Sequence, residues 1–376
     1  MSSAGSSHSE RIVQSLFEHA GIELNGSNPW DIQVLDKRFS RRVIHDTYLG
    51  LGESYMEGWW ECDALDEMIC RVLKARLEQQ VRSSWSMKAH ILRSRLCNLQ
   101  APSRTYKVGE THYDLGNDLY KAMLDSRMNY TCGYWRNAET LEDAQRAKLD
   151  LVCRKIGLKA GMHVLDLGCG WGSFAKYAAE MYGARVTGVT ISREQVSLGR
   201  ELCRGLPVEL SLQDYRSVEG TYDAVVSIGI MEHVGQKNYR TYMEVTDRCL
   251  KKGGVAFIHT IGGNRSTAIA NRWTTKYIFP HGMLPSIAQL GAAMEGLFVM
   301  EDWHNFGPDY DKTLMAWYDN FERAWPQFRD RYDEVFYRMW RFYLLSCAGS
   351  FRARNIQLWQ IVMTRPGTSQ PDCRIT

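Results

Sequence analysis

The chain has 376 residues, which suggests two or three domains and a core large enough to need neither disulfides nor a structural metal. Lys and Arg total 46 and Asp and Glu total 43, so the net charge of +3 excludes a globally basic nucleic-acid coat protein and an acidic disordered chain. No apolar run reaches the ~18 residues of a membrane-spanning helix, and the first residues lack the apolar segment of a secretion signal. A cytoplasmic protein that does not bind nucleic acid is therefore expected.

The ten cysteines form no C-x-x-C pair and no Cys/His cluster with the spacing of zinc ligands. Without a secretion signal, each cysteine is expected to be a reduced thiol that packs as a small apolar side chain. No metal site is predicted.

Residues 1–84 are predicted to form a small, mainly helical domain. Asn25-Gly26 lies between alternating apolar residues, a pattern that predicts a β-hairpin.

Residues 85–104 are interpreted as a basic amphipathic linker. From Arg71 to Lys107 there are nine Lys or Arg residues and a single acid, Glu78. Apolar residues recur at helical spacing beside Lys88, Arg93 and Arg95. Such a helix could lie on an anionic membrane surface, or it could be a solvated linker docked between two domains; the sequence favours neither.

Residues 105–376 are predicted to form one α/β catalytic domain. Short apolar strands separated by helices indicate a doubly wound, Rossmann-like parallel sheet, with ligands bound at the carboxyl ends of the strands. The strands are expected at 163–167, 184–190, 208–212, 224–230 and 255–260.

A glycine-rich turn follows the first strand of this domain, in the run VLDLGCGWG. Gly168 and Gly170 start a G-x-G-x-G spacing, whereas the dinucleotide fingerprint needs G-x-G-x-x-G. Asp166 lies two residues before the first glycine, where a cofactor with a cationic sulfonium and amine would bind. The second strand also ends without an acid, so Thr190 and its neighbours must offer neutral hydrogen bonds. These features favour an S-adenosylmethionine-dependent methyltransferase over a dehydrogenase, with candidate cofactor contacts at Asp166, Gly168, Gly170, Thr190, Ser192 and Gln195.

The turn after the third strand supplies Gln213, Asp214 and Tyr215 as further cofactor-binding candidates. Asp214 is placed to accept a hydrogen bond from the adenine amine. The alternative is that Asp214 is a turn or helix-capping residue.

Taken together, several long motifs resemble those of the cyclopropane-fatty-acyl-phospholipid synthases of bacteria. The resemblance runs from about residue 10 to 365. It implies a methyltransferase-fold enzyme with a lipid-handling N-terminal domain. It also implies S-adenosylmethionine as cofactor and an unsaturated phospholipid as substrate, and it adds Tyr130 and Thr131 to the cofactor site. The motifs are LGLGESYMEGWWECD, YTCGYW, VLDLGCGWG, VTIS, MEHVG, YIFP, DWHNFG, TLMAWY and CAGSFRARNIQLWQ.

The reaction that the resemblance implies is methylene transfer to a cis double bond of an acyl chain. The alkene attacks the cofactor's methyl group, and loss of a proton from the resulting carbocation closes a cyclopropane ring. In the family the base is a bound bicarbonate. The positions that match its ligands are Cys132, Glu232, His259, Tyr310 and the backbone of Ile261. Cys347 also matches a family motif, although a nucleophilic thiol has no task in this mechanism.

Each of these side chains also has a structural alternative. Glu232 could form a simple ion pair with His233, His259 could be a core histidine, and Tyr310 could be held by ring packing alone. Cys132 is a weak hydrogen-bond donor. The ring-rich residues 303–343 could stabilise a carbocation or form an aromatic core.

Two other functions remain open at this point: a fatty-acyl methyltransferase that leaves a methyl or methylene branch, and a catalytically silent lipid-binding protein. The expected partners are the inner face of the membrane, contacted peripherally, and a second copy in a homodimer.

Overall fold

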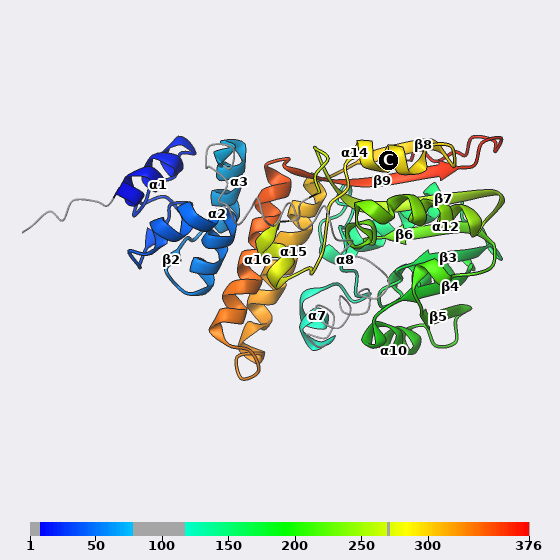
Figure 1. Ribbon diagram of the computed structural model, residues 1–376. Coiled ribbons are helices and arrows are strands. Elements are labelled where there is room, and N and C mark those ends of the chain that lie inside the picture. The colour runs from blue at the N-terminus through cyan, green and yellow to red at the C-terminus, as the bar shows by residue number, and fades with distance from the viewer. Residues whose placement is uncertain (1–7, 78–116, 269–270, 376) are drawn as a thin grey trace, which may run out of the picture.

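The computed structural model describes residues 8–77, 117–268 and 271–375 (Figure 1). The basic linker predicted at 85–104, with Lys88, Arg93 and Arg95, lies outside these residues. The N-terminal part is mainly helical, as predicted, and a two-stranded antiparallel ribbon links its helices. Its elements are α1 (His8–His19), β1 (Gln33–Val34), α2 (Phe39–Met56), β2 (Trp60–Glu61) and α3 (Leu65–Lys74).

The hairpin predicted at Asn25-Gly26 is wrong. Leu24 and Ile32 form an isolated parallel bridge instead of an antiparallel pair. The loop between them closes around the Asp31 carboxylate, which accepts hydrogen bonds from the backbone N–H groups of Glu23 and Asn28 at 2.8 Å each. A Cβ on Gly26 would approach Asp31 Oδ2 to 2.3 Å, so this glycine permits close packing rather than a tight two-residue turn.

The remaining part contains a seven-stranded sheet of order β5-β4-β3-β6-β7-β9-β8. The first five strands of this order are parallel, and their positions agree with the predicted ones within a few residues. Two further strands, β8 and β9, were not predicted from the sequence, and β9 runs antiparallel to both β7 and β8. The strands are β3 (His163–Leu167), β4 (Arg185–Thr190), β5 (Val208–Leu212), β6 (Tyr222–Ile228), β7 (Leu250–Gly263), β8 (Val299–Asn305) and β9 (Ile356–Thr364).

Helices cover both faces of the sheet, so its central strands read as almost continuous apolar runs. On β3, Val164 packs toward α8 and α9, whereas Leu165 and Leu167 pack toward α12 and α14. This doubly wound arrangement confirms the predicted Rossmann-like fold. The helices around the sheet are α8 (Leu141–Lys155), α9 (Ser173–Tyr182), α10 (Arg193–Leu202), α11 (Met231–Val234), α12 (Tyr239–Arg248), α13 (Arg272–Tyr277) and α14 (Ile287–Met294), with short 3-10 turns η1 (Tyr215–Ser217) and η2 (Gln236–Asn238).

Two long helices join the N-terminal part to the sheet (Figure 1). Trp60 of β2 and Phe342 of α16 belong to the same apolar cluster as Trp317 of α15, and all three are buried. Most rings of residues 303–343 therefore build a core between the two parts, which is the structural alternative stated above. The elements of this layer are α7 (Asn117–Met123), α15 (Pro308–Ala324), η3 (Trp325–Gln327) and α16 (Glu334–Arg352).

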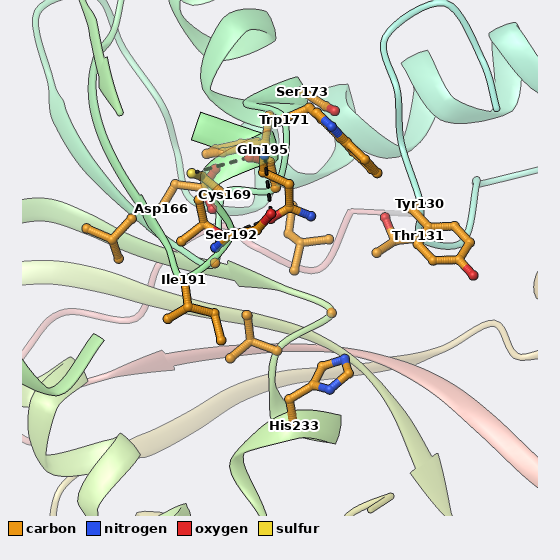
Figure 2. Close-up of a pocket in the computed structure, with 18 of the residues that line it drawn as sticks. Tyr130, Thr131, Asp166, Cys169, Trp171, Ser173, Ile191, Ser192, Gln195 and His233 are labelled. Atoms are coloured by element: carbon orange, nitrogen blue, oxygen red, sulfur yellow. Dashed lines mark hydrogen bonds between the residues drawn. The ribbon is translucent and has the colours of Figure 1, made fainter. Parts of the chain in front are cut away.

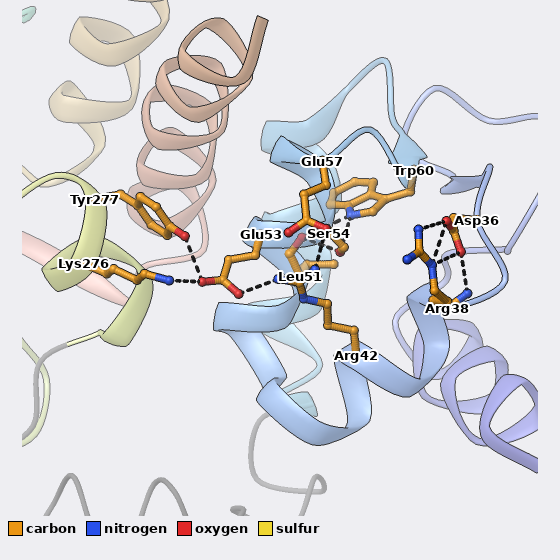
Figure 3. Close-up of polar contacts among 10 residues, drawn as sticks. All are labelled: Asp36, Arg38, Arg42, Leu51, Glu53, Ser54, Glu57, Trp60, Lys276 and Tyr277. Carbon is orange, nitrogen blue, oxygen red and sulfur yellow. Dashed lines mark hydrogen bonds and ion pairs between the residues drawn. The ribbon is translucent and has the colours of Figure 1, made fainter.

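A charged contact between the two parts centres on Glu53 of α2 (Figure 3). Its carboxylate accepts from Lys276 Nζ at 2.6 Å, from the Tyr277 hydroxyl at 2.9 Å and from Arg42 Nη2 at 2.8 Å. Burial alone would raise the pKa of Glu53, but these hydrogen bonds lower it overall. The ionised carboxylate therefore stabilises the packing of α2 against α13.

We expect Glu53→Ala to lower the free energy of unfolding by about 1.5–3 kcal/mol, because three donors lose a charged acceptor. Since the folded-state pKa is lowered, this contribution is present above pH 4.5 and is lost as the pH falls below it. Denaturant unfolding of wild type and variant at pH 7 and at pH 3.5 measures the loss of unfolding free energy at each pH. The matched control is Glu57→Ala, which removes an exposed partner of Arg42 and should cost less than about 1 kcal/mol. Equal losses for the two variants would contradict the prediction.

Candidate active site

Two adjoining cavities lie at the carboxyl ends of the parallel strands. The first has a volume of about 170 Å³ and surrounds the glycine-rich turn. The second has a volume of about 830 Å³ and extends between the sheet, α16 and the N-terminal part. Their linings share Tyr130, Thr131, Gly229 and His233. Reactants bound in the two cavities would therefore meet at these residues.

The glycine-rich turn gives the first cavity a wall of bare backbone. Gly168 and Gly170 have φ values of +76° and +55°, which residues with a Cβ rarely adopt. A Cβ on Gly168 would also come within 1.9 Å of the Ile230 side chain. At Gly170 nothing lies within 4 Å of a built Cβ, so a ligand can approach the backbone there directly. α9 begins right after the turn, with Ser173 in the cavity wall (Figure 2).

Asp166 contributes a buried carboxyl to this cavity. Its side chain is buried, and Oδ2 has no hydrogen-bond partner among the described residues. Burial raises the pKa of Asp166 to about 7, although the nearby Lys148 acts in the opposite direction. An orphaned buried carboxyl is costly unless a ligand satisfies it. A ligand with a cationic amine, such as S-adenosylmethionine, fits this position.

Lys148 of α8 is a cavity residue that the sequence analysis missed. Its ammonium is buried and donates to Asn129 Oδ1 at 3.1 Å and Thr131 Oγ1 at 2.9 Å. Burial lowers the pKa of Lys148 to about 8. In the sequence this lysine is one of several charges on an amphipathic helix, where the usual expectation is an exposed side chain. No local signal distinguishes it.

The end of β4 presents neutral polar groups, as the sequence predicted. Thr190 Oγ1 donates to Gln195 Oε1 at 2.7 Å, and Ser192 caps α10 by accepting from the Gln195 backbone N–H at 3.3 Å (Figure 2). All three side chains line the first cavity. They offer hydrogen bonds to a ligand such as a ribose without adding charge.

The turn after β5 brings Gln213 and Tyr215 into the wall of the first cavity, together with Arg216. Asp214 lies between them, but its carboxylate caps η1 and accepts from Arg216 Nε at 2.9 Å and Nη2 at 3.0 Å. In the structure Asp214 is therefore a helix-capping residue, which was the alternative to a contact with adenine. An adenine contact from Asp214 would require the ion pair with Arg216 to open.

Glu232 and His259 bring unsatisfied polar atoms into the second cavity. Glu232, on α11 directly after β6, accepts from the Ile261 backbone N–H at 2.6 Å through Oε1, while Oε2 has no partner among the described residues. Burial raises the pKa of Glu232 to about 7. His259 lies on β7 with Nδ1 at 3.4 Å from the Gln360 amide, and its buried Nε2 likewise has no partner in the described ranges.

His233 does not form the ion pair that the sequence allowed. It lines both cavities, and its ring lies edge-on to Phe279 with centroids 5.5 Å apart. Burial lowers the pKa of His233 to about 4, so the imidazole is neutral near pH 7. His233 therefore carries no positive charge near neutral pH that could pair with the Glu232 carboxyl.

Of the other candidate catalytic residues, two line the second cavity and one does not. Tyr310 lines the second cavity and stacks on Phe351 at 4.5 Å. Cys347 also lines it, and burial raises the pKa of its thiol to about 12, so it is no thiolate nucleophile at neutral pH. Cys132 is fully buried, and its thiol donates to the Gly133 carbonyl at 3.1 Å rather than lining the cavity.

Comparisons with known proteins agree with this geometry. The family model described as mycolic acid cyclopropane synthetase matches residues 100–361. The chain belongs to this family. It is 53% identical to the cyclopropane-fatty-acyl-phospholipid synthase of Escherichia coli K12, over 94% of this chain and 93% of that protein. The resemblance found in the motifs, and the prediction of an enzyme of the methyltransferase class, are thereby confirmed.

Two more distant relatives are similar over most of this chain. The crystal structure of the mycolic acid cyclopropane synthase CmaA1, complexed with SAH and CTAB, superposes with a TM-score of 0.64. It is 32% identical, and the match covers 69% of this chain and 97% of that one. A probable fatty acid methyltransferase of Pseudomonas putida is 33% identical over 93% of this chain and 91% of that protein.

Proposed function

We propose that the chain transfers a methylene group from S-adenosylmethionine to the cis double bond of an unsaturated phospholipid acyl chain, forming a cyclopropane ring. The observation that carries the proposal is the pair of adjoining cavities, one with a buried carboxyl and bare backbone, the other large and lined with rings. The similarity to the E. coli phospholipid enzyme over nearly the whole chain supports the lipid substrate. The CmaA1 complex supports a cofactor of the S-adenosyl type.

When bound, the cofactor would supply an electrophilic methyl group, and the residues of the chain would do the rest. Asp166 would hold the cationic end of the cofactor, while the polar residues at the end of β4 would contact its ribose. The alkene carbon would take up this methyl group as the sulfur–methyl bond breaks, so the neutral thioether would leave and the acyl chain would carry a carbocation. Tyr130, Tyr310 and Tyr343 line the second cavity, and each ring whose face met this cation would stabilise it by about 0.5–2 kcal/mol.

The base that removes the proton is proposed to be bicarbonate. The unpaired atoms Glu232 Oε2 and His259 Nε2 fit a small polar ligand, and Tyr310 and Ile261 line the same cavity. When bound, bicarbonate would take the proton released as the ring closes. Cys132 fits this set less well, since its thiol already donates to a backbone carbonyl. The thiol of Cys347 has no step to perform.

The decisive experiment incubates the protein with methyl-labelled S-adenosylmethionine and vesicles of unsaturated phospholipid, followed by NMR of the acyl product. We expect cyclopropane signals and no new olefinic protons. Turnover should fall when bicarbonate is removed and recover when it is returned. A methylene branch with olefinic protons would favour the second candidate, a fatty-acyl methyltransferase, which the P. putida relative represents. Binding of the cofactor without turnover would favour a silent lipid-binding protein.

The N-terminal part is proposed to handle the lipid, because Tyr48, Leu73 and Lys74 contribute to the second cavity. Among the described helices, none is long and apolar enough to cross a bilayer. We propose that the protein binds peripherally to the cytoplasmic face of the membrane and acts there as a homodimer. The proposed domains are residues 1–84, 85–104 and 105–376.

Changing Lys88, Arg93 and Arg95 together to Gln should weaken binding to anionic vesicles by a few kcal/mol at low salt, since each cation near such a surface contributes about 1 kcal/mol. Wild-type binding should weaken as salt rises, and the triple variant should respond less steeply. Cosedimentation with vesicles at several salt concentrations measures the affinity and its salt dependence for the two proteins. Equal binding of the two proteins would assign residues 85–104 to a plain linker.

A further inference from the structure

The second cavity is lined by cations on its solvent-exposed side. Lys74, Arg76, Arg265 and Arg354 all contribute to the lining and are exposed, whereas Glu232 is the one carboxylate among the described lining residues and lies deep inside. The cavity therefore combines an apolar, ring-lined interior with a positively charged opening. This is the distribution that an amphipathic anion would complement.

Within the part of the chain that the structure describes, three of these cations have no carboxylate partner. The neighbouring Arg352 shows the contrast, because it pairs with Asp66 at 2.7 Å and Asp311 at 2.9 Å. Arg76, Arg265 and Arg354 form no ion pair with a carboxylate within the described ranges. Their charges remain available to a ligand.

The opening is assembled from separate segments that are tied together. Asn264 Nδ2 donates to the Arg354 carbonyl at 2.8 Å, which joins the loop after β7 to the turn after α16. Lys74 and Arg76 come from the end of α3, which packs against α16. The cluster therefore depends on the docking of the N-terminal part onto the catalytic part.

Arg76 and Arg354 occupy the same unusual position at the end of a helix. Each lies two residues beyond the last residue of its helix, with φ values of +52° and +57°, and each donates its N–H back into the final turn, to Leu73 and Phe351. Glycine adopts this conformation with less strain and is the common residue there. An arginine at a helix C-terminus also interacts favourably with the helix dipole, which is the competing structural explanation.

We infer that Arg76, Arg265 and Arg354, together with Lys74, form a subsite for the phosphodiester of the lipid whose acyl chain enters the second cavity. Arginine suits this task, because its planar guanidinium donates two parallel hydrogen bonds to phosphate oxygens. The inference rests on the proposed function and deepens it by assigning the head-group end of the substrate. The phosphate would fix how deeply the acyl chain reaches toward Glu232 and Tyr310.

The first test is binding without turnover. Isothermal calorimetry would compare wild type and Arg76→Gln/Arg354→Gln with a short-chain phosphatidylglycerol kept monomeric, and with inorganic phosphate. We expect the Kd for the lipid to rise by about tenfold or more in the variant. Phosphate alone should bind weakly and compete with the lipid. A matched control, Arg204→Gln/Lys252→Gln, removes two exposed cations outside both cavities and should bind like wild type. An unchanged Kd in the first variant would overturn the inference.

The second test separates a phosphate subsite from general attraction and from helix capping. In neutral detergent micelles, Arg76→Gln/Arg354→Gln should raise KM for a phospholipid but not for a diacylglycerol with the same acyl chains. Arg76→Gly/Arg354→Gly should raise KM equally while the melting temperature stays the same or increases. Equal effects on the two lipids would overturn the subsite. Absence of cyclopropane product from wild type would instead overturn the proposed function, and the calorimetry would still decide the subsite.

Discussion

Glu232→Gln is expected to lower turnover by at least about 10²-fold while leaving cofactor affinity nearly unchanged. The substitution keeps the shape of the side chain, and its amide oxygen can still accept from Ile261 N–H. It removes the carboxylate that would position the base and balance the carbocation, and loss of one positioned proton-transfer group typically costs 10²–10⁴-fold. Single-turnover formation of labelled cyclopropane, with calorimetric binding of S-adenosylmethionine, measures the two effects separately.

Glu301→Gln is the matched control for this prediction. Glu301 is also a buried carboxylate, accepts from Thr364 Oγ1 at 2.6 Å and lies on β8, where it lines neither cavity. Its turnover should stay close to wild type. The fold should tolerate Glu232→Gln, since burial already raises the pKa of this carboxyl to about 7 and so favours a neutral group. Turnover within threefold of wild type in Glu232→Gln would exclude Glu232 as a residue that positions the base.

Asp166→Asn is expected to weaken binding of S-adenosylmethionine by at least about tenfold, because a buried carboxylate that pairs with a cationic ligand is lost. The neutral amide is nearly isosteric, so the protein should remain folded. The two cavities should respond independently: Asp166→Asn should change cofactor affinity, and Glu232→Gln should change turnover. Calorimetry on both variants checks this separation.

The pH dependence of cofactor binding gives the same assignment a second check. The pKa of Asp166 is about 7 without ligand, so below pH 7 the carboxyl is increasingly protonated and a bound cation must displace the proton. Wild-type affinity should therefore rise by about tenfold between pH 6 and pH 8. In Asp166→Asn this rise should be lost, apart from the smaller effect of Lys148, whose pKa is about 8. An equal rise in both proteins would exclude Asp166 as its source.

Local sequence chemistry determined much of the catalytic fold. The strands β3 to β7 are apolar runs bounded by turn residues, and a buried parallel strand needs that pattern wherever it lies in the sheet. The glycine spacing after β3, Asp166, and the Ser192 cap of α10 act over a few residues each. Such features can be read directly, because the residues that satisfy them are neighbours in the sequence. The family motifs extended this to Glu232, His259 and Tyr310, which the structure places around one cavity.

Tertiary packing decided the rest. β9 enters the sheet between β7 and β8 and runs antiparallel to both, and the apolar pattern of a strand encodes neither its neighbours nor its direction. Lys148 is buried beside the cofactor cavity only because α8 docks there, and Asp214 is held by Arg216 instead of facing a ligand. Most rings of residues 303–343 are buried in a hydrophobic core because the N-terminal part packs against α15 and α16. The charged opening of the second cavity joins three distant segments, and only the folded chain brings their charges to one place, since electrostatic contacts depend on distance in space rather than along the sequence.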